Sequence, residues 1–305
     1  MARSWIGVAI ALAVLVLAGV LLARTVGRFD LADVRNALQQ LEPRHMVGAA
    51  LCSIGSYVVL TGVDLLGIRY AGRELPYRHV AFASLVALSL GHSLGFAALS
   101  SGAVRFRFYR RWGLRVVEIA RVILFCGLTV LLGYATVGGV MLATSAGWVA
   151  ETAGIPEATL HLVSAVAFAI PIVYLTAVAL GRPVRLGRIE IVPPRPILAA
   201  AQLVVGTLDV LLVAGVLHQT LGGSEAISYS TLLTVYVAAA VAGMLAHAPG
   251  GIGVVEAVTL AALPGAETIA GLLAFRAIYY LVPLVLGGAA LAIFEISVGR
   301  RAPVG

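Results

Sequence analysis

The residues best suited to chemistry lie in one short stretch between two long apolar runs, HAPGGIGVVE at residues 247–256. Pro249 lacks a backbone N–H, and Gly250, Gly251 and Gly253 allow backbone angles that other residues resist. Inside a bilayer, interrupted backbone is tolerated only where protein or a water-filled cavity satisfies its polar groups. The stretch is therefore either a loop at the membrane surface or the break of a helical hairpin that lines a site.

Charged and aromatic residues around this break have the chemistry of an anion site. Glu256 lies about one helical turn beyond the break, and Arg276 lies inside the next apolar helix. An arginine inside a membrane needs a carboxylate, carbonyl groups or a lipid phosphate beside it, so Glu256 is its natural partner. Tyr279 and Tyr280 follow about one turn along the same helix. Two interpretations stay open: a structural Glu256–Arg276 pair that locks the hairpin, and a phosphate-binding role for Arg276.

A second break is predicted at GHSLG, from Gly91 to Gly95, and at Gly102. It leads into an arginine- and aromatic-rich segment, RFRFYRR at residues 105–111. Guanidinium groups bind phosphates through paired hydrogen bonds. We therefore expect Arg105, the arginine closest to this break, to contact a lipid headgroup. The other arginines of the segment are expected to anchor the chain at the cytoplasmic surface.

Two histidines and two aspartates complete the polar residues of interest. His92 and His247 suit hydrogen bonding at the two breaks, and both are placed with the headgroup site. One histidine in each hairpin does not make a metal site. The sequence also has no serine–histidine–acid arrangement, phosphate loop or cysteine–histidine metal spacing. We therefore expect no metal ion, no cofactor and no catalytic residue. Asp64 and Asp209 lie within or near the ends of apolar runs, where such groups either couple proton movement or cap and pair with neighbours.

The elements that must position these residues are those of an integral membrane protein. Of the 305 residues, 61% are hydrophobic and 11% are charged, and the mean hydropathy is +1.02. Soluble domains carry about 25% charged residues. All 21 basic side chains are arginine, and the formal net charge is +7. Because the arginines gather between the apolar runs, the charge indicates topology and contact with anionic lipid rather than with nucleic acid.

Apolar runs long enough to cross a bilayer predict an all-α polytopic membrane protein with about six spanning helices. The runs cover residues 5–23, 46–68, 116–143, 160–180, 197–218 and 268–298. Apolar side chains in residues 24–45 are spaced as on one face of a helix, which predicts an interfacial amphipathic segment. The whole chain, 1–305, is predicted to be a single transmembrane domain.

Arginine placement predicts which loops face the cytoplasm. Residues 105–115 and 181–196 are arginine-rich, as is the C-terminus, whereas 144–159 has no arginine. This pattern predicts a multi-pass protein of a bacterial-type plasma membrane with both termini in the cytoplasm. Residues 69–78 are arginine-rich as well, although one apolar run alone separates them from 105–115.

If that run crossed the membrane once, residues 69–78 and 105–115 would lie on opposite sides, although both are arginine-rich and expected in the cytoplasm. Both segments can lie in the cytoplasm if residues 79–104 form a re-entrant hairpin that returns to the cytoplasmic side. Residues 228–263 then form a second re-entrant hairpin, which enters from the outside because its flanks have no arginine. Two opposed hairpins between spanning helices are the inverted-topology repeat found in many transporters.

Three motifs resemble the membrane domain of the lysylphosphatidylglycerol synthases, also called multiple peptide resistance factors. They are AALSSGAVRFRFY at 97–109, PGGIGVVE at 249–256 and FRAIYYLVP at 275–283, and the resemblance extends over nearly the whole chain. In that family the membrane domain is assigned as a flippase that carries aminoacylated phosphatidylglycerol to the outer leaflet, and a separate cytoplasmic acyltransferase domain makes the lipid. The chain ends at Gly305, directly after its last predicted helix, so we expect a stand-alone form without the acyltransferase domain.

The resemblance implies a transporter rather than an enzyme: a flippase that moves an anionic or aminoacylated phospholipid, such as aminoacyl-phosphatidylglycerol, between leaflets. Two other functions stay open. One is a membrane-embedded transferase acting on a lipid phosphate, which commonly uses several acidic residues near one face, whereas the carboxylates here are scattered. The other is a scaffold that docks a separate lipid-modifying synthetase through its cytoplasmic arginines. Membrane phospholipids are the expected partners, and the sequence leaves open whether the chain forms a homo-oligomer.

Overall fold

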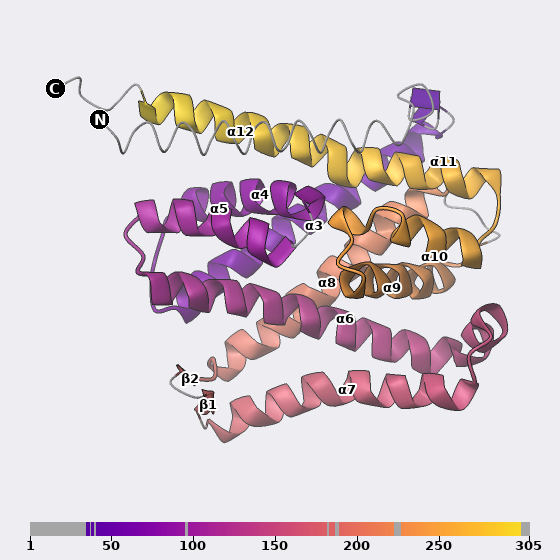
Figure 1. Ribbon diagram of the computed structural model, residues 1–305, viewed down its shortest axis with the longest axis horizontal. Helices are drawn as coiled ribbons and strands as arrows, with labels where there is room; N and C mark the ends of the chain where they lie inside the picture. Colours follow the sequence, from indigo (N-terminus) through magenta and orange to yellow (C-terminus); the bar gives the residue numbers. More distant parts are fainter. Residues whose placement is uncertain are drawn as a thin grey trace.

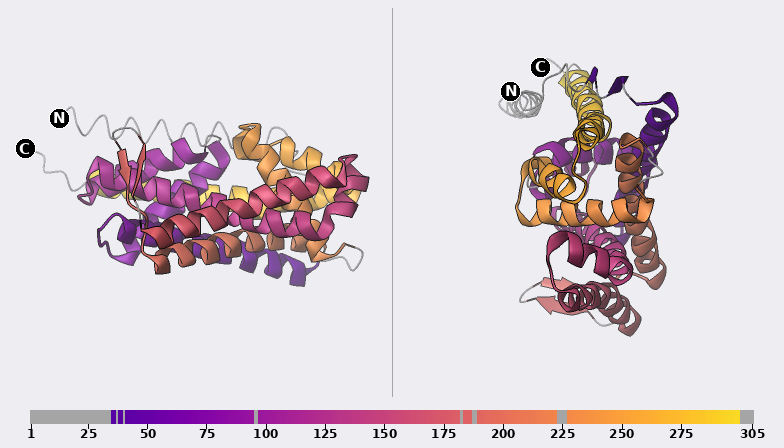
Figure 2. Two further views of the ribbon diagram at one scale, coloured as in Figure 1. Left: turned by 90° about the horizontal axis from the view of Figure 1, so that it is seen from below. Right: turned by 90° about the vertical axis from the view of Figure 1, so that its right-hand side faces the viewer.

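The computed structural model describes residues 35–36, 38–39, 41–94, 97–181, 183–186, 189–222 and 227–299. Over these residues the chain forms an elongated bundle in which most helices run along the long axis (Figure 1 and Figure 2). In chain order the elements are α3 (Pro43–Tyr70), α4 (Tyr77–Leu94), α5 (Ala97–Arg111), α6 (Val116–Ala153), α7 (Glu157–Leu180), β1 (Val184–Leu186), β2 (Ile189–Ile191), α8 (Pro196–Thr220), α9 (Tyr229–Leu245), the short 3₁₀ helix η1 (Pro249–Gly251), α10 (Val254–Ala262), α11 (Ala266–Phe275), the π-helical segment η2 (Arg276–Leu281) and α12 (Val282–Gly299).

Five helices of the described chain are long and apolar enough to cross a membrane: Pro43–Tyr70, Val116–Ala153, Glu157–Leu180, Pro196–Thr220 and Glu267–Phe294. The last of them runs through α11, η2 and α12. These helices contain or closely match the spans predicted at 46–68, 116–143, 160–180, 197–218 and 268–298, so the prediction of a helical, polytopic membrane protein is confirmed at this level. The span predicted at 5–23 and most of the interfacial segment predicted at 24–45 lie outside the described residues.

A short antiparallel hairpin of β1 and β2 departs from the predicted all-α fold. Its register pairs Val184 with Ile191 and Leu186 with Ile189, and it lies in the connection between α7 and α8. Apolar and charged residues alternate in these strands, VRL and IEI, and alternation with period two is the pattern of a strand. Arginine content alone predicts a cytoplasmic loop for this connection and does not reveal the hairpin.

Two helical hairpins form the middle of the bundle. The hairpin of α4 and α5 opens toward the end where α3 stops and α6 begins, and we name this the arginine-rich end because Arg69, Arg73 and Arg121 lie there. The hairpin of α9 and α10 opens toward the opposite end, where α8 stops and α11 begins. At that end His45 on α3 makes a 2.8 Å hydrogen bond between its Nδ1 and Oε1 of Gln219 on α8. The two hairpins therefore point toward each other.

The tips of the two hairpins meet inside the bundle. A Cβ atom placed on Gly250 in η1 would lie 3.0 Å from the carbonyl oxygen of His92 in α4, so the backbones of the two tips are in direct contact. Gly250 has φ of +59°, in the left-handed region that disfavours side chains. Glycine is required here for both reasons: the backbone angle and the close approach.

The breaks of the two hairpins were predicted with unequal success. In the second hairpin the helix stops after Leu245, and Gly250, Gly251 and Gly253 all have positive φ, so the predicted break around Pro249 is confirmed. In the first hairpin α4 continues through Gly91 to Leu94 and α5 is already helical at Gly102. The predicted breaks at Gly91 and Gly102 are therefore wrong, because an isolated glycine costs a helix only about 1 kcal/mol and does not by itself end it. Gly95 lies outside the described residues.

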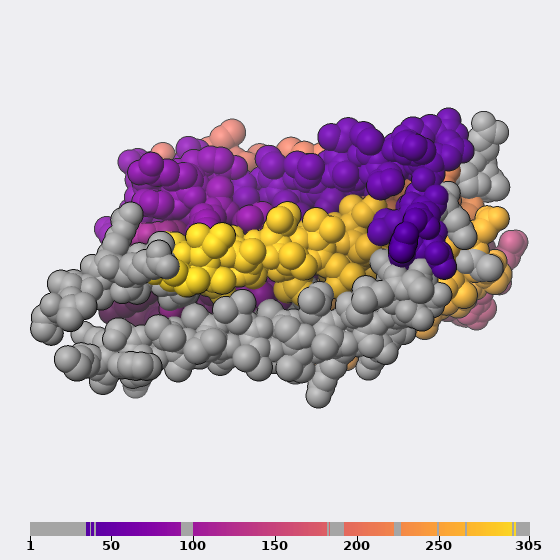
Figure 3. Space-filling view, turned by 90° about the horizontal axis from the view of Figure 1, so that it is seen from above, coloured from indigo at the N-terminus to yellow at the C-terminus, as the bar shows by residue number. Residues whose placement is uncertain are grey.

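Close helix crossings hold the remaining helices around the hairpins. Gly133 of α6 and Gly206 of α8 cross so tightly that a Cβ on Gly133 would lie 2.4 Å from the Gly206 carbonyl oxygen. Small residues allow such approach, and membrane helices gain van der Waals contact from it. Helix α12 runs along the face of the bundle beside α3–α5 (Figure 3), where Gly287 packs against Ser89 of α4. The first hairpin is thus enclosed by long helices.

Candidate functional site

An ion pair between Glu256 and Arg276 lies where the hairpins meet, and we name its surroundings the hairpin junction. Nε of Arg276 donates a 2.6 Å hydrogen bond to Oε1 of Glu256. The other carboxylate oxygen of Glu256 accepts the backbone N–H of Gly253 at 2.7 Å, which caps the first turn of α10. The Arg276 side chain is 2% exposed and that of Glu256 is 15% exposed. The predicted pairing of these two residues is therefore present.

The remaining donors of Arg276 reach the turn of the second hairpin. Nη1 of Arg276 donates a hydrogen bond to the carbonyl oxygen of Gly250, and the guanidinium carbon lies 4.6 Å from the centre of the Tyr280 ring. Nη2 is buried and has no hydrogen-bond partner within the described part of the chain. An unsatisfied buried donor costs about 1–3 kcal/mol, and more when it is charged. Arg276 therefore holds the turn in place while one of its donors remains available to an acceptor.

A wide helical turn places Arg276 and the two tyrosines side by side. They belong to η2, where the helix takes the π form before α12 continues. Isolated π turns inside α-helices occur frequently at functional sites because the extra residue changes where side chains project. Here Tyr279 and Tyr280 have ring centres 5.3 Å apart, nearly at right angles. Tyr280 faces the guanidinium, and Tyr279 faces α3 and α4.

His92 brings the first hairpin into the same cluster of rings. Its ring lies 5.8 Å from that of Tyr279 and 6.1 Å from that of Tyr57 on α3, and Tyr280 is 6.4 Å away. Nδ1 of His92 is the second buried nitrogen of the junction that has no partner among the described residues. The structure therefore brings together five residues predicted for the site: His92, Glu256, Arg276, Tyr279 and Tyr280.

His247, the other predicted histidine, has a different position. It is exposed on the turn after α9 with φ of +51°, and its Nδ1 lies 3.0 Å from the carbonyl oxygen of Leu245. A non-glycine residue with positive φ is uncommon, although histidine is among the types that tolerate it. His247 is thus part of the break, and its predicted contact with a headgroup stays a prediction.

Arg105 has a carboxylate partner rather than a headgroup. Its Nε and Nη2 each donate a 2.7 Å hydrogen bond to the two oxygens of Asp64 on α3. Asp64 also accepts from Ser84 at 2.8 Å and from Tyr109 at 2.7 Å, and it is fully buried. The position of Arg105 near a break predicted contact with a lipid phosphate, but its paired hydrogen bonds to Asp64 satisfy its charge within the protein. Of the alternatives for Asp64, pairing is the one the structure shows.

A polar connection from α8 to the junction was not predicted. Ser56 of α3 donates a 2.5 Å hydrogen bond to Asp209 of α8 and lies 3.1 Å from the hydroxyl of Tyr279. Tyr57 donates to the carbonyl oxygen of Tyr279 at 3.4 Å. The lone Asp209 inside an apolar run was the available signal, but nothing in the sequence distinguished Ser56 from the other serines. Within the described chain no group of three or more histidine, cysteine, aspartate or glutamate side chains is arranged to hold a metal ion.

The fold and this site define a class: a polytopic helical membrane protein in which two opposed hairpins meet at a buried arginine. No model of a known protein family matches the chain. Over 275 residues it is 30% identical to the uncharacterized protein slr0712 of Synechocystis sp., an alignment that covers 88% of this chain and 85% of that protein. The chain belongs to the same family as slr0712. Because that relative is uncharacterized, any assignment of function depends on the site.

Proposed function

We propose that the protein is a phospholipid translocase that moves an anionic or aminoacylated phospholipid, such as aminoacyl-phosphatidylglycerol, between the leaflets. One observation carries the proposal: Arg276 is buried where two opposed hairpins meet, and its Nη2 has no acceptor among the described residues. A phosphate oxygen is the acceptor that a guanidinium group binds best, because it accepts paired, charge-assisted hydrogen bonds.

The geometry suggests how a headgroup would reach Arg276. The bond from Arg276 to the Gly250 carbonyl and the contact of Gly250 with His92 hold the two tips together. A phosphate that takes over the bond to Nη1 and adds one to Nη2 would release the turn of the second hairpin and separate the tips. Glu256 could keep its bond to Nε meanwhile, so the charge of Arg276 would remain compensated. The acyl chains would stay in the bilayer outside the bundle.

Topology and resemblance support the same function. In this proposal about six helices span a plasma membrane with both termini in the cytoplasm, and the two hairpins are re-entrant halves of an inverted-topology repeat. Helical hairpins that open toward opposite ends of the bundle are consistent with that arrangement. Two of the three motifs that resemble the lysylphosphatidylglycerol synthase membrane domain, at 249–256 and 275–283, supply Glu256 and Arg276.

Transport of labelled lipid by the purified protein tests the proposal. Liposomes are made with phosphatidylglycerol carrying a fluorescent acyl chain, and dithionite then bleaches the label in the outer leaflet alone. We expect bleaching to continue into the inner-leaflet pool when the wild-type protein is present, but not in empty liposomes.

The decisive variant is Arg276→Lys, which keeps the charge but replaces a planar group of several donors by a single ammonium. We expect it to slow lipid movement by at least about tenfold, because one charge-assisted hydrogen bond contributes about 1.5–3 kcal/mol. Arg78→Lys is the matched control, since Arg78 is exposed at the start of α4 and outside the junction. Unchanged transport by a folded Arg276→Lys protein would limit Arg276 to a structural role.

A further inference from the structure

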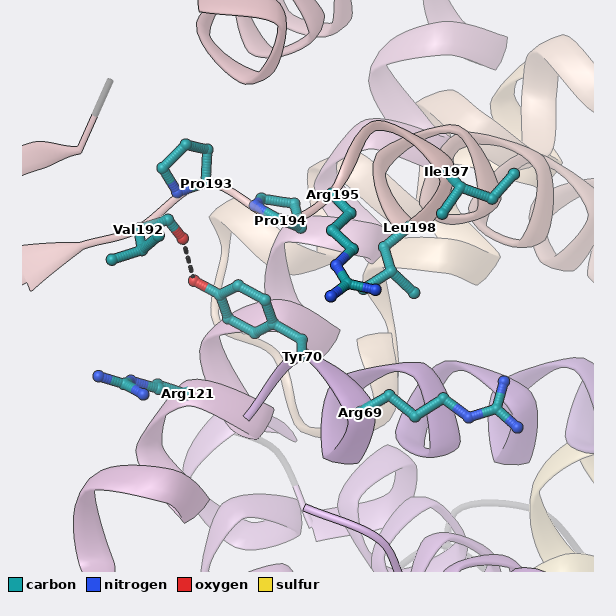
Figure 4. Close-up of a pocket in the computed structure, with 9 residues that line it drawn as sticks. All are labelled: Arg69, Tyr70, Arg121, Val192, Pro193, Pro194, Arg195, Ile197 and Leu198. Atoms are coloured by element: carbon teal, nitrogen blue, oxygen red, sulfur yellow. Dashed lines mark hydrogen bonds between the residues drawn. The ribbon is translucent and has the colours of Figure 1, made fainter. Parts of the chain in front are cut away.

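A pocket of about 540 Å³ at the arginine-rich end forms a second candidate binding site. It lies between the last turn of α3, the first turns of α6 and the segment that leads into α8 (Figure 4). Three arginines from these three places line it: Arg69, Arg121 and Arg195. Figure 4 shows them distributed around the ring of Tyr70, with Arg121 on one side and Arg195 and Arg69 on the other. The pocket is distinct from the hairpin junction, which none of its lining residues reaches.

The walls of this pocket are held in place before any ligand binds. The hydroxyl of Tyr70 donates a 2.7 Å hydrogen bond to the carbonyl oxygen of Val192, and its ring stacks on Phe125 of α6 at 5.3 Å. Tyr70 therefore joins α3, α6 and the segment before α8. Pro193 and Pro194 follow directly and restrict that segment, because proline fixes φ. A preformed site loses less free energy to ordering when a ligand enters.

The pocket carries three positive charges that no carboxylate of the described side chains compensates. Within the described chain none of Arg69, Arg121 and Arg195 forms an ion pair, whereas Arg73, Arg105, Arg115 and Arg276 each have a carboxylate within 4.0 Å. The residues that line the pocket include no acid. Arg195 also precedes the first turn of the 25-residue helix α8, whose N-terminal end carries partial positive charge. Three like charges repel each other, and a bound anion would relieve that repulsion.

An apolar edge beside the arginines indicates the kind of anion. Ile197 and Val192 line the same pocket and are 74% and 56% exposed. They lie at the end of a helix that is long and apolar enough to span a membrane, where headgroups meet acyl chains. A free inorganic anion would gain nothing from these side chains, but a lipid would cover them.

We propose that this pocket binds the phosphate of an anionic phospholipid headgroup, with the acyl chains passing over Val192 and Ile197. Arg195 donates hydrogen bonds to the phosphate, and Arg69 and Arg121, which lie on either side of the Tyr70 ring, add positive charge around it. The proposal concerns lipid binding at the arginine-rich end and does not depend on translocation at the hairpin junction. A volume of 540 Å³ lies within the range of about 300–1,000 Å³ that small-molecule sites occupy.

Titration of the purified protein in detergent with three soluble probes tests the site. The probes are short-chain phosphatidylglycerol, short-chain phosphatidylcholine with the same acyl chains, and inorganic phosphate, and the readout is the thermal unfolding temperature. We expect a saturable rise with phosphatidylglycerol and a much smaller response to the other two. Arg121→Gln combined with Arg195→Gln should raise the half-saturating concentration of phosphatidylglycerol by at least about tenfold, because it removes the charge-assisted hydrogen bond from Arg195 and two of the three positive charges of the pocket. Arg78→Gln, an exposed arginine at the same end and outside the pocket, should leave the titration unchanged.

Each contrary result has a defined meaning. All three arginines are exposed, so the variants are expected to fold, and their unfolding temperature without probe verifies this. If the double variant and Arg78→Gln titrate like the wild type, the pocket is not the site, and the proposal is overturned. If inorganic phosphate saturates at the same concentration as the lipid, the pocket binds phosphate without regard to the acyl chains, and the lipid assignment is overturned. An equal response to phosphatidylcholine would remove the role assigned to negative charge.

Discussion

Replacing Glu256 by glutamine measures how far the hairpin junction depends on its ion pair. Glutamine retains the length of the side chain and a carbonyl oxygen that can accept the Gly253 N–H bond, so the cap of α10 is kept. The substitution removes the negative charge beside the Arg276 side chain, and that side chain is 2% exposed. Removing one partner of a buried pair costs about 3–5 kcal/mol. Because the Glu256 side chain is itself 15% exposed, we expect a loss near the lower limit, about 3 kcal/mol.

The second variant and the double variant separate the pair from its surroundings. Arg276→Gln leaves Glu256 with its bond to the backbone of Gly253 and with some access to solvent, so a smaller loss of about 1–3 kcal/mol is expected. In the double variant neither charge is present, and no buried charge is left without a partner. The double variant should therefore lose about 2 kcal/mol less unfolding free energy than the two single losses added together. A coupling of this size is within the range found for residues in contact.

Unfolding in detergent and lipid transport in liposomes are measured on the same four proteins. The double variant should be about as stable as Glu256→Gln alone, at a loss of about 2–4 kcal/mol, whereas its transport should be lost because the donors of Arg276 are gone. The exposed pair Glu42–Arg44, with side chains 62% and 74% exposed, is the matched control, and Arg44→Gln should change stability little. Strictly additive losses at Glu256 and Arg276 would mean that the pair contributes no interaction energy, and the junction described above would be refuted.

Three further predictions concern the surroundings of the junction. Gly250→Ala should lower stability by at least about 1–2 kcal/mol in the same unfolding assay, because Gly250 has positive φ and its Cβ would lie 3.0 Å from the His92 oxygen; a neutral effect would contradict the contact between the tips. Asp64→Asn leaves Arg105 charged and 4% exposed, so a loss of about 3–5 kcal/mol is expected, and a loss below 1 kcal/mol would contradict the buried pair. Accessibility tags at Gly72 and Gly113 should report the same side of the membrane and a tag at Gly222 the other side; opposite sides for Gly72 and Gly113 would exclude a re-entrant first hairpin.

The junction was predictable because its residues lie close together in an apolar sequence. Glu256 and Arg276 are 20 residues apart, and Arg276 is the nearest arginine to Glu256 in the sequence, inside an apolar helix where it needs a partner. Pro249 with its neighbouring glycines removes a backbone donor and favours positive φ, so the break followed from chemistry alone. The identity of these residues was enough, without knowledge of how the helices pack.

Other features depended on packing that the sequence does not display. Arg105 and Asp64 are 41 residues apart, and whether an arginine near a break meets a carboxylate or a lipid is decided by the position of α3. Gly91 and Gly102 are identical in type to the glycines of the true break, but glycine in a membrane helix serves close packing as well. Ser56 became part of a polar connection because α3 and α8 bring it to Asp209.

The two buried ion pairs differ in a way that bears on function. Each pins the second helix of a hairpin to a neighbouring helix: Arg105 of α5 to Asp64 of α3, and Glu256 of α10 to Arg276 at the start of η2. Asp64 accepts four hydrogen bonds from three side chains, and neither it nor Arg105 has a buried polar atom without a partner in the described structure.

Arg276, in contrast, gives one bond to a carboxylate and one to a backbone carbonyl, and its Nη2 has no acceptor in the part of the chain that the structure describes. A ligand gains little by approaching a charge that is already satisfied, since it must first break the existing bonds. An incompletely satisfied charge favours a ligand that supplies the missing acceptor. The first pair is therefore suited to hold its hairpin still, and the second to let its hairpin move when a phosphate arrives.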